Sequence, residues 1–214
     1  MPISSGACSA SVPIEPRGSW PIEFAKACAT YSPKLTARGG EGKTVEMDET
    51  FVGGLEKKGT GGIGKEAVYS LVERGGRVRS HHVPAVTANN LRPIIEAHID
   101  GATAVYTDEG AASKGLGRLF DKHESVNHSL GEYVRGDVHT NTIEGYFSIL
   151  KRGINGVYHH VSQQHLKRFL AEFDFRYNER MKLGVNDKAR ATKAIKGIVG
   201  KRLTYQQPDE TAHA

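Results

Sequence analysis

Hydrophobic and polar positions alternate in short runs over the first part of the chain. Residues 44–52 (TVEMDETFV) alternate in the way that favours a β-strand, and a Gly-Gly pair at 53–54 closes the run. Residues 67–73 and 77–83 are two further strand candidates. The Gly-Gly pair at 75–76 between them is typical of a β-hairpin. The pattern therefore predicts three antiparallel strands.

Helical periodicity dominates the rest of the chain, interrupted by two short strand candidates. The longest helix begins after Ser162, in the N-cap position, and its apolar residues recur at the spacing of a core-facing stripe: Leu166, Phe169, Leu170, Phe173 and Tyr177. The elements before it are a helix from Asn89 or Asn90 to about His98, a strand at 102–110, a helix at 111–120 and a strand at 124–127. This order predicts a mixed sheet covered by helices.

Residues 139–151 (HTNTIEGYFSILK) predict a further helix with two distinct faces. Its apolar stripe comprises Ile143, Phe147 and Leu150, and its polar stripe comprises Asn141, Glu144, Ser148 and Lys151. Because the acid and the lysine lie two turns apart on one face, the acid can hold a cation while the amine contacts a phosphate. A capping box, with Asn141 as N-cap and Glu144 at the third position, explains the same residues equally well.

Two other acids have independent reasons to lie near this helix. Asp48 and Asp108 each occur at or near the end of a predicted strand, where open sheets of this kind gather their ligands. Three neighbouring carboxylates repel one another unless a divalent cation neutralises them, and oxygen ligands suit magnesium or manganese. Two such ions stabilise the attacking and leaving oxygens of a phosphodiester displacement. Ordinary turn chemistry remains the alternative for Asp48 and Asp108.

Composition and charge narrow the class of protein. With 38% hydrophobic and 25% charged residues, the 214-residue chain has the make-up of a folded globular protein. The excess of 29 basic over 24 acidic residues is compatible with a polyanionic partner, although a solvated basic face gives the same excess. Cys8 and Cys28 form no disulfide framework or paired-cysteine zinc module. No apolar run approaches the length of a membrane helix, which predicts a cytoplasmic protein without membrane contact.

Several long runs, in this order, resemble the catalytic domain of DDE insertion-sequence transposases of the ISXO type. They are VEMDETFVGG at 45–54, YTDE at 106–109, HTNTIEG at 139–145, LKRG at 150–153, GVYHHVS at 156–162, EFDFRYN at 172–178 and GKRLTY at 200–205. Many motifs in one order are more specific than any single acid. The resemblance implies an α/β, RNase H-like fold with a mixed β-sheet flanked by helices. It also implies DNA cleavage followed by strand transfer at transposon ends.

The resemblance carries residue roles over by position. Asp48 and Asp108 match the first two acids of the DDE set, and Lys151 matches the basic residue that follows the third. Relatives differ in whether an asparagine or a glutamate fills the third role. Glu144 is the better match here, with Asn141 as the alternative, because a carboxylate holds a hard cation better than an amide does. The implied cofactor is a pair of Mg²⁺ or Mn²⁺ ions bound by Asp48, Asp108 and Glu144.

Basic side chains near the two long helices are the candidates for contact with DNA. They are Lys151, Arg152, Arg176 and Arg180. For the last two, complementarity to the helix dipole competes with phosphate contact. His139 is a candidate for orienting a ligand or a water molecule. The histidines at 159, 160 and 165 lack cysteine partners and fit loop, cap or phosphate contacts better than a zinc site.

The predicted organisation is a weakly structured leader at 1–42, an RNase H-like catalytic domain at 43–182 and a basic tail at 183–214. Full members of the family usually carry a zinc ribbon and a helix-turn-helix ahead of the catalytic domain, and residues 1–42 resemble neither. The sequence predicts a metal-dependent transposase that acts on element ends and target DNA as a homodimer or larger assembly. The alternatives are a catalytically silent DNA-binding remnant of a truncated transposase and a general nuclease of the same fold.

Overall fold

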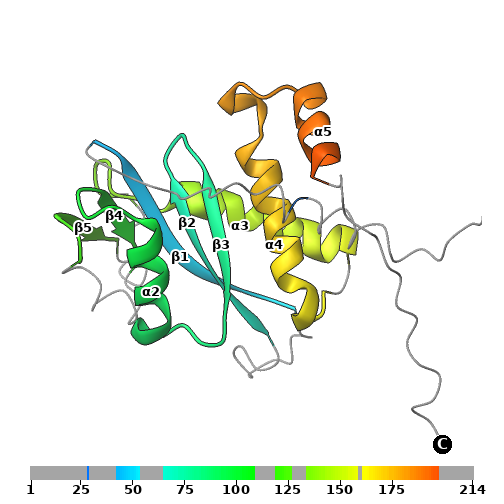
Figure 1. The fold of residues 1–214 in the computed structure, drawn as a ribbon. Coiled ribbons are helices and arrows are strands. Elements are labelled where there is room, and N and C mark those ends of the chain that lie inside the picture. Colours follow the sequence, from blue (N-terminus) through cyan, green and yellow to red (C-terminus); the bar gives the residue numbers. More distant parts are fainter. Residues whose placement is uncertain are drawn as a thin grey trace, which may run out of the picture.

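A five-stranded mixed sheet organises the part of the chain that the computed structural model describes, residues 28, 42–53, 65–108, 119–126, 134–158 and 161–197. The strands are β1 (Thr44–Val52), β2 (Glu66–Glu73), β3 (Val78–Val83), β4 (Ala104–Thr107) and β5 (Lys122–Ser125), in the spatial order β3-β2-β1-β4-β5 (Figure 1). The first three strands pair antiparallel, whereas β4 is parallel to both β1 and β5. The predicted mixed sheet is confirmed.

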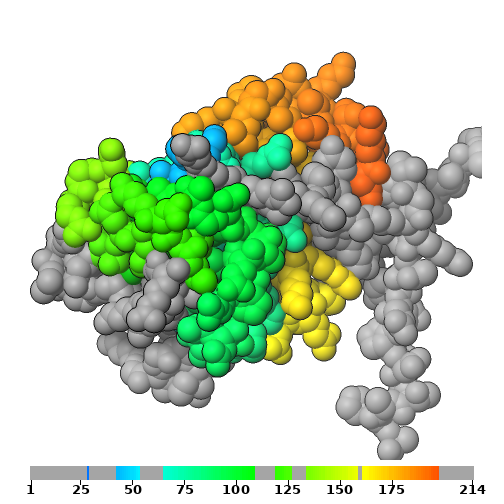
Figure 2. Space-filling model, turned by 60° about the vertical axis from the view of Figure 1, so that its left-hand side comes forward, coloured from blue at the N-terminus to red at the C-terminus, as the bar shows by residue number. Residues whose placement is uncertain are grey.

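Helices cover both faces of this sheet. They are α2 (Ala88–His98), α3 (Asn141–Gly153), the π-helical turn η4 (Ile154–Tyr158), α4 (Gln163–Asn178), the 3₁₀ turn η5 (Met181–Leu183) and α5 (Asp187–Lys196). In Figure 1, α2 lies on one side of the strands, and α3 and α4 lie on the other. The space-filling view of Figure 2 shows green α2 in the middle, with the orange-to-red segment of α5 above it. None of the helices in the described ranges is long and apolar enough to span a bilayer.

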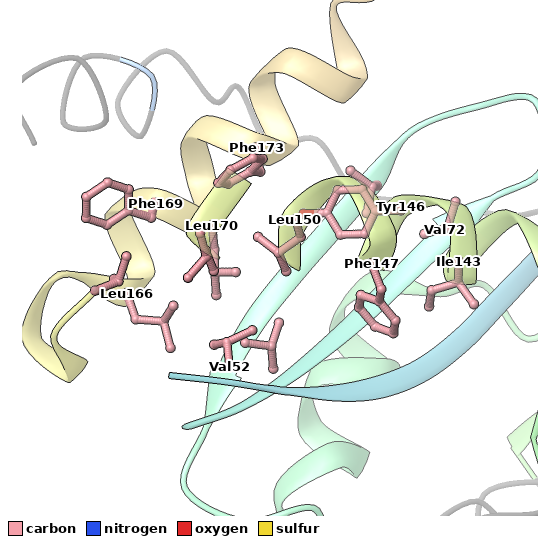
Figure 3. Close-up of a cluster of buried hydrophobic side chains, with 14 residues drawn as sticks. Val52, Val72, Ile143, Tyr146, Phe147, Leu150, Leu166, Phe169, Leu170 and Phe173 are labelled. Carbon is pink, nitrogen blue, oxygen red and sulfur yellow. The ribbon is translucent and has the colours of Figure 1, made fainter. Parts of the chain in front are cut away.

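Alternation along β1 supplies both hydrophobic cores. Val45 and Met47 pack in a cluster with Leu91 and Ile95 of α2, whereas Val52 belongs to the cluster under α3 and α4. The stripe predicted for α3 is buried there, and it meets side chains of α4, as Figure 3 shows. Burying a side chain of this size contributes about 1.5–3 kcal/mol, so these two clusters fix the layers of the domain.

Side chains of α4 close the outer edge of β3. The Asn178 side-chain oxygen accepts the Val78 N–H (2.7 Å), and its amide donates to the Val78 carbonyl (2.9 Å). One turn earlier, the Asp174 carboxylate accepts the Ser80 N–H (2.8 Å) and hydroxyl (2.7 Å). Backbone groups of an edge strand that would otherwise face water are therefore bonded within the domain.

Element boundaries differ from the sequence-based expectations at several points. The N-cap of α2 is Thr87 instead of Asn89 or Asn90, and the last strand lies at Lys122–Ser125, two residues before its predicted position. Ser162 is the N-cap of α4 as predicted, but its side chain makes no capping hydrogen bond. Most of the helix expected at 111–120 lies outside the described residues. Patterns fix the type of an element better than its ends, because terminal turns depend on local hydrogen bonds.

The predicted leader and tail receive only partial description. Cys28 is the one residue between 1 and 41 that the structure describes, and it is buried against Phe175 and Ala194. Part of the segment expected to be a basic tail forms α5, whose N-cap Asn186 accepts the Ala189 N–H (2.8 Å). The region from 183 therefore includes a properly capped helix that packs through Ala194.

Candidate active site

Pairing between β1 and β4 brings the first two predicted acids together. The parallel pairing ends with Met47 opposite Thr107. The residue that follows each of these two is an aspartate: Asp48 in β1 and Asp108 directly after β4. Both side chains are partly buried. The two carboxylates therefore meet where the parallel β1–β4 pairing ends. The prediction that Asp48 lies at or near a strand end is wrong, because β1 continues to Val52, whereas Asp108 does follow directly on β4.

A third acid, Glu49, lies with Asp48 and Asp108, and the sequence analysis did not assign it to the site. Carboxylate oxygens of Asp48, Glu49 and Asp108 all lie within 4.8 Å of one another. Glu49 also donates its backbone N–H to the Asp48 carboxylate (2.7 Å). The signal in the sequence was adjacency to Asp48, but alternation along a strand predicts that neighbouring side chains point to opposite faces. The structure nevertheless brings a carboxylate oxygen of each close to Asp108.

Charge repulsion and burial make this cluster a candidate site for a cation. Burial raises the pKa of the Asp48 carboxyl to about 8, and the charge of Asp108 adds to this rise. The Glu49 N–H lowers the pKa of Asp48, while the carboxylates of Glu49 and Glu144 raise it further. Burial and Asp108 also raise the pKa of Glu49. Acids that resist ionisation together are stabilised when a divalent ion neutralises them, and an all-oxygen set fits Mg²⁺ or Mn²⁺.

Glu144 lies in the first turn of α3, next to this cluster. It is exposed and accepts a hydrogen bond from the Thr140 hydroxyl (3.0 Å). It is not a member of the close group of three, but its charge reaches Asp48. The N-cap of α3 is Thr140, and Asn141 is already helical, so the capping-box explanation of Asn141 and Glu144 is wrong. The Glu144 side chain is exposed at the start of α3.

The polar stripe of α3 faces outward as the periodicity predicted. Asn141, Ser148 and Lys151 are exposed together with Glu144, and Arg152 is exposed beside them. Seven residues separate Glu144 from Lys151, which is about 10 Å along a helix axis. His139, the predicted orienting residue, is half-buried, and its Nδ1 accepts the Asn141 N–H at 3.4 Å. These groups form a polar track that leads away from the carboxylates.

Three of the predicted DNA contacts line one groove between α3 and α4. The groove has a volume of about 420 Å³, and its lining is Tyr146, Ile149, Arg152, Gly153, Val157, Phe173, Arg176, Tyr177 and Arg180. Arg180 stacks on the Tyr177 ring (3.8 Å to the centroid) and donates to the Gly76 carbonyl (3.0 Å). Arg176 donates to the buried Glu172 (2.6 Å). Arg176 and Arg180 are thus held in place beside the apolar side chains that line the groove.

The predicted histidine roles divide between described and undescribed positions. His159 and His160 lie outside the described residues, whereas His165 contacts the Arg168 guanidinium (3.3 Å). Among the described residues, the group with the spacing of metal ligands consists of carboxylates and includes no histidine.

Comparison with known proteins fits this geometry. Residues 39–178 match the model of the ISXO2-like transposase domain, which covers β1 to α4 and therefore all three predicted acids. The chain belongs to this family. As a member of the ISXO2-like transposases it has the RNase H-like α/β fold that the sequence motifs implied, with the mixed sheet flanked by helices.

A relative comes from a mobile element. The ISXO2-like domain is 33% identical over 129 residues to an uncharacterized protein in transposable element ISH50 of Halobacterium salinarum. The alignment covers 58% of this chain and 43% of that protein, so the chain spans less than half the length of this relative.

Proposed function

We propose that this ISXO2-like transposase cleaves DNA phosphodiesters at the ends of an insertion element and joins the freed strand to target DNA. The observation that carries the proposal is the meeting of Asp48 and Asp108 at the end of the parallel β1–β4 pair, beside the α3 turn that bears Glu144. These acids, with Glu49 close by, would hold Mg²⁺ or Mn²⁺. When bound, such ions supply the positive charge that stabilises the attacking and leaving oxygens.

The side chains of the protein itself provide orientation. Lys151 lies on the same face of α3 as Glu144 and would hold a phosphate beside the reacting one. Asn141 is one turn before Glu144 and can offer an amide oxygen or a hydrogen-bond donor to the same nucleotide. Partial burial of Asp48 and Asp108 limits water around the scissile bond, which strengthens the electrostatic interactions there.

DNA would continue from the acids into the groove between α3 and α4. Among the described residues, the lining of the groove includes Arg152, Arg176 and Arg180 and no acidic side chain, which suits a phosphate backbone. Its apolar lining includes Ile149, which is 50% exposed, and Val157, which is 68% exposed. These side chains would contact the deoxyribose or base surfaces of the same DNA strand whose phosphates the arginines bind.

Assembly follows from the chemistry proposed. Because an element has two ends and each needs its own set of acids, the active form would be a homodimer or a larger complex on DNA, in the cytoplasm where the DNA lies. Crosslinking on paired end DNA would show two copies per complex. A single copy per two ends would contradict the proposed assembly.

The direct test is cleavage and strand joining on labelled element-end DNA with Mg²⁺ or Mn²⁺. Asp108→Asn should reduce cleavage by at least about a hundredfold. Losing a residue that only supports a metal ligand costs up to about that much, and Asp108 is proposed as a ligand itself. It should still fold, because the change removes a like charge beside Asp48. Asp187→Asn, an exposed acid of α5, is the matched control and should cleave like the native protein.

The outcomes separate the candidate functions. Cleavage without joining would favour a general nuclease. Native protein that binds element-end DNA but never cuts it, with Asp108→Asn binding equally well, would contradict the proposal and favour a silent DNA-binding remnant.

A further inference from the structure

An ion pair between a buried glutamate and a partly buried arginine connects β1 to the start of α3. Glu46 is fully buried (0% exposed) and lies two residues before Asp48 in β1, where alternation puts both on one face. Its carboxylate accepts the Arg74 Nε–H (2.6 Å), the backbone N–H groups of Thr142 (2.8 Å) and Ile143 (3.0 Å), and the Thr142 hydroxyl (2.8 Å). The negative charge that stabilises the N-terminus of α3 thus comes from the sheet.

Arg74 holds the segment that leads into α3. It follows β2 in the hairpin turn, and its two terminal nitrogens donate to the carbonyls of Asp137 (2.6 Å) and His139 (2.8 Å). Its guanidinium also lies over the Tyr106 ring in β4, 4.8 Å from the centroid. The planar fork of an arginine can make these contacts at once, whereas a lysine offers a single point of attachment.

The contacts of this pair fall beside each of the three predicted acids. Glu46 is two residues before Asp48, and Tyr106 is two residues before Asp108. Ile143, whose N–H binds Glu46, immediately precedes Glu144. We propose that Glu46 and Arg74 are positioning residues that set where Glu144 lies relative to Asp48 and Asp108, and thereby set the affinity of the site for a divalent cation. The inference rests on the proposed function, because it takes these acids as the metal ligands.

A purely stabilising role explains this arrangement poorly. The ion pair contributes little net stability compared with an apolar side chain at position 46, because the Glu46 charge must leave water completely. A serine, threonine, asparagine or aspartate at the N-cap would supply a local cap for α3, yet Thr140 makes no side-chain cap bond there. What a distant carboxylate adds is a fixed position of the helix on the sheet. Partners of metal ligands act in this way on ligand orientation.

The test compares two isosteric neutralisations of buried glutamates. Glu46→Gln removes the charge from the pair, and Glu172→Gln does the same on α4, where a 1% exposed carboxylate binds Arg176 and Tyr158 away from the acids. Mn²⁺ alone is titrated into each full-length protein by calorimetry, at a temperature where circular dichroism shows all of them folded. We expect Glu46→Gln to weaken Mn²⁺ binding by about 10- to 100-fold. Glu172→Gln should bind Mn²⁺ like the native protein.

Arg74→Lys provides a second variant should Glu46→Gln fail to fold. It keeps the positive charge beside Glu46 but loses at least one carbonyl contact, so weaker Mn²⁺ binding with retained folding is expected. In cleavage assays both variants should need more Mn²⁺ for half-maximal rate, and excess Mn²⁺ should restore part of the rate.

Two different results would contradict the positioning role of Glu46 and Arg74, and they differ in what they say about the proposed function. If the native protein binds Mn²⁺ and cleaves DNA while Glu46→Gln and Arg74→Lys bind Mn²⁺ equally well, the positioning role is wrong and the proposed function stands. If the native protein neither binds Mn²⁺ nor cleaves element-end DNA, the proposed function fails and the inference fails with it.

Discussion

His81 shows how a single buried side chain can make stability depend on pH. It lies in β3, and its ring is 4.8 Å from that of His98. Its Nε2 is buried and has no hydrogen-bond partner among the described residues. Burial lowers the pKa of His81 to about 4, and the charges of His98 and Arg79 act in the same direction. The folded protein therefore keeps this imidazole neutral at pH values where the unfolded chain protonates it.

We predict that His81 makes the fold less stable as the pH falls from about 6.5 to about 4. In this window the unfolded state binds more protons, so the free energy of unfolding rises with pH. The expected loss at the acid end is about 1–3 kcal/mol. Urea denaturation of native protein and His81→Gln at several pH values measures it. Burial raises the pKa of Asp174 to about 6, but this group is present in both proteins, so its contribution cancels when their pH slopes are compared. Equal pH slopes in the two proteins would contradict the prediction.

Helix α3 illustrates what decides the contact between two elements. Gly153, its last residue, faces Phe173 of α4, and a Cβ atom there would overlap the ring, with the Cε1 atom 2.6 Å away. Phe173 also packs in the cluster of Figure 3, so moving the ring away from the added Cβ would disturb its contacts there. The glycine therefore permits α3 and α4 to approach closely, with their stripes in contact.

Two alanine substitutions in α3 should have opposite effects. Gly153→Ala should lower the free energy of unfolding by about 1–3 kcal/mol, because it overpacks a filled core. Gly145→Ala, with no atom within 4 Å of the added Cβ, should raise it by about 0.5–1 kcal/mol through helix propensity. Urea unfolding measures both. Equal effects of the two changes would show that the Phe173 contact does not limit the packing.

Sequence patterns predicted the elements that depend on local periodicity and missed the contacts that depend on distant residues. The buried stripe of α3 and the end of β4 just before Asp108 follow from spacing alone. The cap of α3 does not, because Glu46 lies 96 residues before Thr142 in the chain. Glu49 was missed as well, since its only signal was its place next to Asp48, and neighbouring side chains of a strand are expected on opposite faces.

At the scale of the whole molecule, the position of the arginines predicts how binding responds to salt. Arg152→Ala should weaken binding to DNA of any sequence and lower the slope of log K against log salt by about 1, the value for one lost phosphate contact. Lys188→Ala, an exposed basic residue of α5 outside the α3–α4 groove, should leave the slope unchanged. Fluorescence anisotropy at several salt concentrations measures both, and equal slopes for the two variants would argue against DNA in the groove.

The closure of β3 by α4 also determines how copies of the protein can come together. Because Asp174 and Asn178 occupy the outward N–H groups of Ser80 and Val78, another chain cannot add a strand there while α4 stays docked. Addition of a strand from another copy at this edge is therefore blocked in the native state. If α4 detached, the same N–H groups would become a template for pairing with other chains. The docking of α4 thus also protects the protein from fibrous aggregation through the edge of β3.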